Sequence, residues 1–226
     1  MFTLLLHFLL VRGHCAFDAA LRFLWLPLGL MPSAANSDRL CERFGNNNVV
    51  SFGLSLIGVA MLVFTTVERE TDYAVLAAIF FLIGIGMGLT MAPSTTLVMD
   101  SIPHDKAGVG SATNDASREV GGAFGIAIVG SAVNEIYQRE MEVPVGLEVH
   151  SEVVSESFPA AIRIGNELLA LGDEMGHELI VNAEFAFVEG MTGAAAISAM
   201  AAMINAVLVK LYMPSRIFGE EAPDGR

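Results

Sequence analysis

Long uncharged runs separated by short polar segments are the main feature of the hydrophobic pattern of this chain. The two clearest runs, residues 49–67 and 73–99, contain nineteen and twenty-seven uncharged residues. A helix needs about 20 predominantly apolar residues to cross the hydrocarbon core of a bilayer, which is about 30 Å thick. Each run is therefore predicted to form one membrane-spanning helix, with ERETD at 68–72 as the loop between them.

Four further segments complete the predicted set of spans. Residues 1–11 are apolar but too short to cross and are interpreted as the end of a span, with a signal peptide as the competing interpretation. Residues 19–37 contain Arg22 and two prolines, which membrane helices tolerate when neighbouring groups satisfy the freed carbonyls. Residues 109–133 and 190–209 are the last two spans. The pattern predicts an all-α integral membrane protein, with a bundle of about five complete transmembrane helices and a truncated N-terminal one.

The composition supports the membrane class. Hydrophobic residues make up 54% of the chain and charged residues only 16%, and the mean hydropathy is +0.58. Such a chain is too apolar for an ordinary soluble domain. The lipid bilayer is therefore its first predicted partner.

Residues 137–187 interrupt the apolar pattern with an acidic segment that cannot cross a membrane. Ten acidic side chains lie between Glu140 and Glu184, in a chain whose formal net charge is −13. This segment is predicted to be a loop with a surface helix at about 159–175. Its acidity argues against nucleic acid as a partner.

The span at 109–133 carries three charged residues among small ones: Asp115, Arg118 and Glu119. At about 100° per residue they share one arc of about 120°, while the opposite face is mostly apolar. Each central charge costs roughly 2.5–3.5 kcal/mol on insertion scales, so the helix needs polar neighbours. Asp115 and Arg118 have the i,i+3 spacing of an ion pair.

Two interpretations of this polar cluster stay open. An intramembrane carboxylate is a functional hypothesis by default, so Asp115 is a candidate for proton exchange or for contact with a cationic substrate. Alternatively, Asp115, Arg118 and Glu119 form a network that only fixes the packing of the helix.

Glycines in two spans predict close helix packing. Gly84 with Gly88, and Gly121 with Gly125, have the spacing that lets two membrane helices approach closely. The segment GIGMG at 84–88 lacks the spacing and the strand context of a phosphate-binding loop. The predicted packing glycines are Gly84, Gly88, Gly121, Gly122 and Gly125.

The cysteines and histidines predict no metal site and no cofactor. The two cysteines, Cys15 and Cys41, lack metal-ligand spacing, and no disulfide is expected between them. None of the five histidines is paired at helical spacing with another histidine or a cysteine.

The order of these motifs resembles the C-terminal third of the fourteen-span drug:proton antiporters of the major facilitator superfamily. The resemblance covers roughly residues 5–214. Its most specific block, Gly84 to Gly130, resembles the twelfth and thirteenth spans, and AFVEGM at 186–191 resembles the entry to the fourteenth. SDRLCERFG at 37–45 resembles the superfamily's cytoplasmic-loop motif. The motif residues in this chain are Asp38, Arg39, Glu42, Arg43 and Gly45.

The resemblance implies a function and a location. It implies part of a proton-coupled multidrug efflux transporter, not an enzyme, that exports amphipathic or cationic drug-like compounds from the cell across the plasma membrane. The first eight spans are absent, so the chain is a fragment or needs a complementary N-terminal half. A transport-inactive remnant or accessory bundle is the alternative.

The family's arrangement also implies an orientation. It places the C-terminus and Cys41 in the cytoplasm, and Cys15 and the acidic segment 137–187 outside. The distribution of Lys and Arg agrees weakly, with six in the segments assigned inside and five in those assigned outside.

Overall fold

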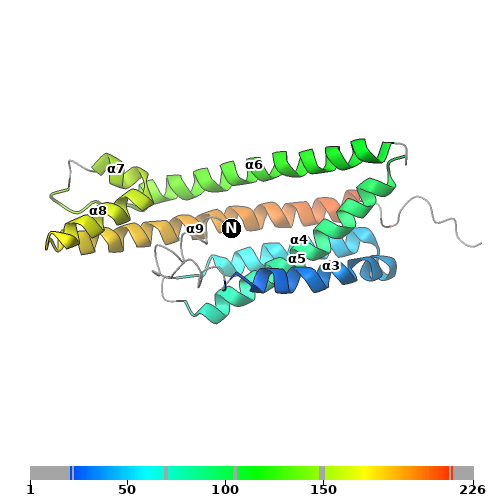
Figure 1. Ribbon diagram of the computed structural model, residues 1–226. Helices are drawn as coiled ribbons and strands as arrows, with labels where there is room; N and C mark the ends of the chain where they lie inside the picture. Colours follow the sequence, from blue (N-terminus) through cyan, green and yellow to red (C-terminus); the bar gives the residue numbers. More distant parts are fainter. Residues whose placement is uncertain are drawn as a thin grey trace, which may run out of the picture. The chain divides into compact units, whose positions relative to one another are not determined.

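The computed structural model describes residue 21 and residues 23–68, 71–103, 106–147, 151–213 and 215, except the side chain at 152. The predicted span at 1–11, the first residues of the span at 19–37, and Cys15 lie outside the described residues. Seven helices follow one another along the described chain (Figure 1). They are α3 (Trp25–Phe44), α4 (Asn46–Phe64), α5 (Tyr73–Asp100), α6 (Ala107–Glu140), α7 (Ser151–Glu156), α8 (Phe158–Ala170) and α9 (Met175–Tyr212).

The described residues contain no β-strand, so the prediction of an all-α membrane protein is confirmed. Four of these helices, α4, α5, α6 and α9, are long and apolar enough to cross a membrane. Helix α3 does not meet that criterion, because its second half carries the charged residues of the motif at 37–45.

The chain divides into two compact units, and α4, α5, α6 and α9 each contribute residues to both. The first, here called the bundle unit, contains the described residues of 25–60, 78–125 and 199–226. The second, here called the acidic unit, contains the described residues of 21–24, 61–77 and 126–198.

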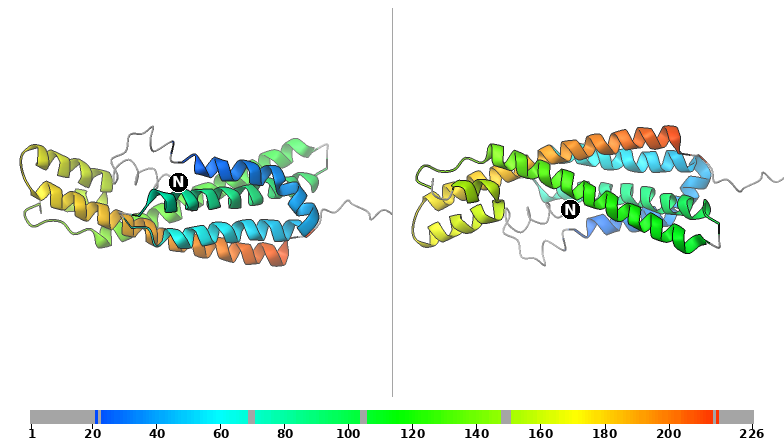
Figure 2. Two further views of the ribbon diagram at one scale, coloured as in Figure 1. Left: turned by 90° about the horizontal axis from the view of Figure 1, so that it is seen from below. Right: turned by 90° about the horizontal axis from the view of Figure 1, so that it is seen from above.

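Close contacts between helices build the bundle unit. Helices α3 and α5 meet at glycines: a Cβ atom on Gly29 would lie 3.0 Å from the backbone nitrogen of Ile85, and one on Gly88 would lie 2.7 Å from the carbonyl oxygen of Leu30. The last part of α9 lies beside α4 (Figure 2), where the Ser51 hydroxyl donates to the carbonyl oxygen of Ala206 at 2.7 Å. Backbones approach this closely because small side chains leave room between the helices.

An aromatic core holds the acidic unit together. Tyr137 at the end of α6 donates from its hydroxyl to the carbonyl oxygen of Val154 on α7 at 2.9 Å. The ring of Phe158 on α8 meets the Tyr137 ring edge-on at 6.1 Å and stacks on the Phe187 ring of α9 at 4.1 Å. Figure 1 shows α7 and α8 beside the end of α6 and the beginning of α9. The segment expected to be a loop is therefore largely helical and has its own core.

Local chemistry explains how α8 ends and α9 begins. Gly172 takes a φ of +82°, which most side chains would resist, and the backbone N–H of Asp173 donates to the carbonyl oxygen of Leu168 at 3.0 Å. The carboxylate of Asp173 then accepts from the backbone N–H of Met175, the first residue of α9. The surface helix expected at about 159–175 accordingly stops at Ala170.

The observed helix ends differ from the predicted span ends wherever polar residues continue a helix. Helix α6 runs to Glu140 rather than 133, and α9 begins at Met175 rather than 190. The segment 37–45, which resembles a cytoplasmic-loop motif, is also mostly helical, because α3 continues to Phe44 and α4 begins at Asn46. Gly45 alone makes the turn, with a φ of +87°.

Candidate functional site

The charged residues of α6 lie on a helix that the rest of the described chain hardly covers. Every residue from Asp115 to Gly125 is exposed. In water this would be unremarkable, but charges on a membrane-length helix are costly unless they meet polar groups or a water-filled cavity. The surroundings of each charge therefore matter.

Arg118 is attached to the neighbouring helix α5. One guanidinium nitrogen, Nη2, donates to the carbonyl oxygen of Met91 at 3.2 Å and to the hydroxyl of Thr95. The Thr95 hydroxyl itself donates to the same Met91 carbonyl at 2.8 Å. Met91 and Thr95 flank Pro93, which lies inside α5. This interhelical cluster was not predicted from the sequence. The run of polar residues that follows Pro93 could have indicated it.

Asp115 and Glu119 are not joined to Arg118. In the described part of the chain a salt bridge joins Arg139 to Glu135 at 3.0 Å, and none involves Asp115 or Glu119. The expected i,i+3 pair between Asp115 and Arg118 is therefore absent, because the arginine reaches across to α5 instead. Asp115 and Glu119 are one helical turn apart and form a carboxylate stripe beside Arg118.

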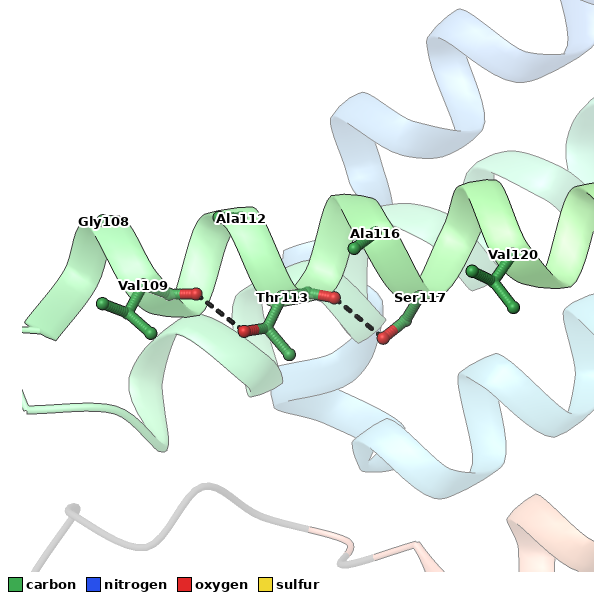
Figure 3. Close-up of a pocket in the computed structure, with 7 residues that line it drawn as sticks. All are labelled: Gly108, Val109, Ala112, Thr113, Ala116, Ser117 and Val120. Carbon is green, nitrogen blue, oxygen red and sulfur yellow. Dashed lines mark hydrogen bonds between the residues drawn. The ribbon is translucent and has the colours of Figure 1, made fainter.

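A shallow hollow of about 640 Å³ lies along the other side of α6 (Figure 3). Its lining consists of small and apolar side chains: Gly108, Val109, Ala112, Thr113, Ala116, Ser117 and Val120. The hydroxyls of Thr113 and Ser117 donate back to the carbonyl oxygens of Val109 and Thr113, both at 2.8 Å. Because these donors are already used, the hollow suits an apolar contact better than a polar ligand.

The predicted packing glycines fall into two groups. Gly84 and Gly88 lie against α3, where a Cβ atom would overlap Leu26 and Ser33. A Cβ atom on Gly121, Gly122 or Gly125 would meet no other atom within 4 Å. Within the described structure the expected packing of these three is therefore not seen, because no other helix covers this part of α6.

The residues of the predicted cytoplasmic-loop motif lie at the end of a helix. Asp38, Arg39, Glu42 and Arg43 are exposed on the last two turns of α3, and Gly45 forms the turn. Cys41 lies among them and is half-buried. Desolvation by burial, with a smaller contribution from the charge of Asp38, raises the pKa of the Cys41 thiol to about 11.

The described residues contain no group of three or more His, Cys, Asp or Glu side chains placed to hold a metal ion. The chemistry that this geometry offers is thus that of a carboxylate stripe and an arginine on a membrane-length helix.

Comparison with known proteins identifies the family. The family model of the Major Facilitator Superfamily matches residues 1–126, more than half of the chain. The chain belongs to the major facilitator superfamily. Members of this superfamily are membrane transporters, and the apolar helices of this chain indicate a multi-pass membrane protein in contact with lipid.

Curated relatives of this superfamily chain are drug-resistance and efflux proteins. It is 26% identical over 172 residues to the multidrug efflux pump LfrA of Mycolicibacterium smegmatis, an alignment that covers 76% of this chain and 34% of the relative. It is 31% identical over 131 residues to the methylenomycin A resistance protein of Streptomyces coelicolor, covering 57% of this chain and 27% of that one.

A third relative is the methyl viologen resistance protein SmvA of Salmonella typhimurium, 26% identical over 164 residues that cover 70% of this chain and 32% of the relative. The alignments thus span about a third or less of the length of these three relatives.

Proposed function

We propose that this chain is part of a proton-coupled multidrug efflux transporter that exports amphipathic or cationic compounds. Membership of the major facilitator superfamily supports transport. The efflux and resistance proteins among its relatives support drug-like substrates.

The observation that carries the proposal is the stripe of Asp115 and Glu119 on α6. Both carboxylates are exposed on a membrane-length helix, while the neighbouring Arg118 is engaged by α5. Carboxylates do not face hydrocarbon at acceptable cost, so this stripe lines a water-filled pathway. There Asp115 exchanges a proton or meets a cationic substrate.

The remaining details of the proposal concern architecture. The described helices correspond to spans ten to fourteen of a fourteen-span transporter, with the C-terminus in the cytoplasm and the acidic unit outside. A complementary N-terminal half supplies the other wall of the pathway, opposite Asp115 and Glu119. Substrate and coupling-ion sites of such transporters lie at the interface between their repeats, which is consistent with a stripe at the edge of this bundle.

The test measures efflux of a cationic dye from cells that lack their own drug pumps. The chain is produced alone, and also together with the part of LfrA that lies outside the alignment. We expect dye efflux only when both parts are present, and its loss when a protonophore collapses the proton gradient. Efflux by neither form, with both proteins inserted in the membrane, would contradict the proposal and favour a transport-inactive bundle.

A further inference from the structure

An apolar pocket with a basic mouth lies in the bundle unit, away from the charged stripe of α6. Its volume is about 470 Å³, within the range of about 300–1,000 Å³ that small-ligand pockets occupy. The residues that line it come from α3, α4 and α5: Leu40, Phe44, Asn48, Val49, Phe52 and Leu89. Asn48 is the only polar side chain among them.

Asn48 connects the pocket to a lysine. Its side-chain nitrogen donates to the carbonyl oxygen of Phe44 at 2.6 Å, and its side-chain oxygen accepts from Nζ of Lys210 on α9. Lys210 directly follows the apolar run at 190–209, so it marks the level at which the hydrocarbon ends. The pocket therefore opens at the interface between hydrocarbon and headgroups.

A second cation lies against a side chain that lines the pocket. The guanidinium carbon of Arg43 is 5.3 Å from the centre of the Phe44 ring, which lines the pocket. Asp38 and Glu42 lie on the opposite side of α3 from Leu40, since positions two residues away are about 200° apart on a helix. In the described part of the chain neither Arg43 nor Lys210 forms a salt bridge. Among the described residues, both charges therefore remain available to an anion.

The outer wall of the pocket is apolar and exposed. Phe44 and Phe52 are 54% and 61% exposed, so a bilayer would bring acyl chains directly against them. An occupant must therefore be apolar along its length and anionic at its end. A phospholipid has this layout, and phosphatidylglycerol, whose headgroup is anionic, carries no ammonium group that Arg43 and Lys210 would repel.

We propose that this pocket binds one anionic phospholipid, with an acyl chain between Phe44 and Phe52 and the phosphate at Lys210 and Arg43. The site is independent of transport and of the proposed orientation, because it requires only that the mouth lie at a membrane interface. Bound in this position, the lipid would join α3, α4 and α9 at one end of the bundle.

The experiment measures lipid retention and thermal stability of the purified full chain in detergent. Phosphatidylglycerol is added in one series and phosphatidylcholine in another, and retained lipids are counted by native mass spectrometry. We expect one retained phosphatidylglycerol and a rise in melting temperature, with a much smaller effect of phosphatidylcholine.

Three variants separate the parts of the site. The double variant Lys210→Gln with Arg43→Gln should bind phosphatidylglycerol about 25-fold more weakly. Leu40→Trp should block retention by filling the pocket while both cations remain. Arg163→Gln, which removes an exposed arginine from α8, is the matched control and should bind like the unmodified chain.

Two results would overturn the proposal. One is equal retention of phosphatidylcholine and phosphatidylglycerol, which would indicate an ordinary lipid-facing surface. The other is unchanged phosphatidylglycerol binding in folded Lys210→Gln/Arg43→Gln or Leu40→Trp protein. If Leu40→Trp fails to fold, the double variant decides alone, because it changes only exposed side chains.

Discussion

Arg118 on α6 donates to the carbonyl oxygen of Met91 on α5 at 3.2 Å, across twenty-seven positions of sequence. This contact joins the two helices beside Pro93, where α5 lacks one backbone donor. It also leaves Asp115 and Glu119 without their expected counter-ion on the same helix.

The contact predicts how Arg118 contributes to stability. Arg118→Ala should lower the free energy of unfolding by about 0.6–1.7 kcal/mol, the range of interhelical hydrogen bonds in membranes. Its effect should be non-additive with that of Thr95→Val, because both changes remove the same contact, and additive with that of Asp115→Asn. Unfolding measurements on the single and double variants in detergent check this. Strong coupling between Arg118 and Asp115 instead would show that these two residues form the ion pair within α6.

The carboxylate stripe predicts a separation between transport and insertion. In cells that also produce the remainder of LfrA, Asp115→Asn should reduce dye efflux or change its pH dependence, because the amide cannot exchange a proton. Membrane insertion should stay normal, since an exposed amide costs less than a carboxylate. Glu140→Gln, an exposed residue at the far end of α6, is the matched control. Unchanged efflux across the pH range in Asp115→Asn would remove this residue from the pathway.

Two glycines predict stability changes of opposite sign. Gly88→Ala should destabilise by roughly 1–3 kcal/mol, because the new methyl group would lie 2.7 Å from the Leu30 carbonyl oxygen. Gly121→Ala should stabilise by about 0.5–1 kcal/mol, because nothing surrounds it and alanine restricts the unfolded chain. Thermal unfolding of the two variants gives the comparison. Destabilisation by Gly121→Ala would show that another helix does cover this face.

The aromatic core predicts that the acidic unit can be weakened on its own. Phe158→Ala should cost about 3–5 kcal/mol, since the ring is buried between Tyr137 and Phe187. Tyr137→Phe should cost about 1 kcal/mol by removing one hydrogen bond to a buried carbonyl. Hydrogen exchange and limited proteolysis of 137–187 are the readouts. The matched change Phe185→Ala, at a 60% exposed ring on the same helix as Phe187, should have little effect.

The raised pKa of the Cys41 thiol predicts that its reaction with maleimide depends on pH. Only the thiolate reacts rapidly with maleimide, and a pKa of about 11 keeps the thiol protonated at neutral pH. Labelling of the purified chain should therefore be slow at pH 7 and accelerate steadily as the pH rises toward 11. Asp38→Asn should speed the reaction slightly, because a smaller part of the shift comes from that carboxylate. A rate at pH 7 equal to that of a free thiol would contradict the burial.

The same residue tests the proposed orientation. A membrane-impermeant maleimide applied to intact cells at raised pH should spare Cys41 and label a single-cysteine variant that keeps only Cys15, which lies outside the described residues. Labelling of Cys41 alone would mean that the chain inserts in the opposite direction.

The amino-acid sequence alone determined the membrane class and the positions of the apolar helices. Uninterrupted runs such as 73–99 leave no alternative to a spanning helix, because every backbone polar group in hydrocarbon must be bonded within the segment. It also singled out Asp115, Arg118 and Glu119, since charges on such a helix are rare whatever surrounds them.

Only the tertiary structure decided what those residues contact. Arg118 has an acidic neighbour, Asp115, three residues away on its own helix. Whether the arginine contacts Asp115 or α5 depends on how the two helices meet. The sequence did not show the helical extensions of α6 and α9 for a related reason. Residues 134–140 are mostly polar and residues 175–189 mix charged with apolar side chains, so neither continues an uncharged run. They stay helical because Tyr137 and Phe187 pack on α7 and α8. The apolar pocket with the basic mouth connects Phe44 to Lys210 through Asn48, although the two residues are more than 160 positions apart. Periodicity within one segment carries no information about such contacts.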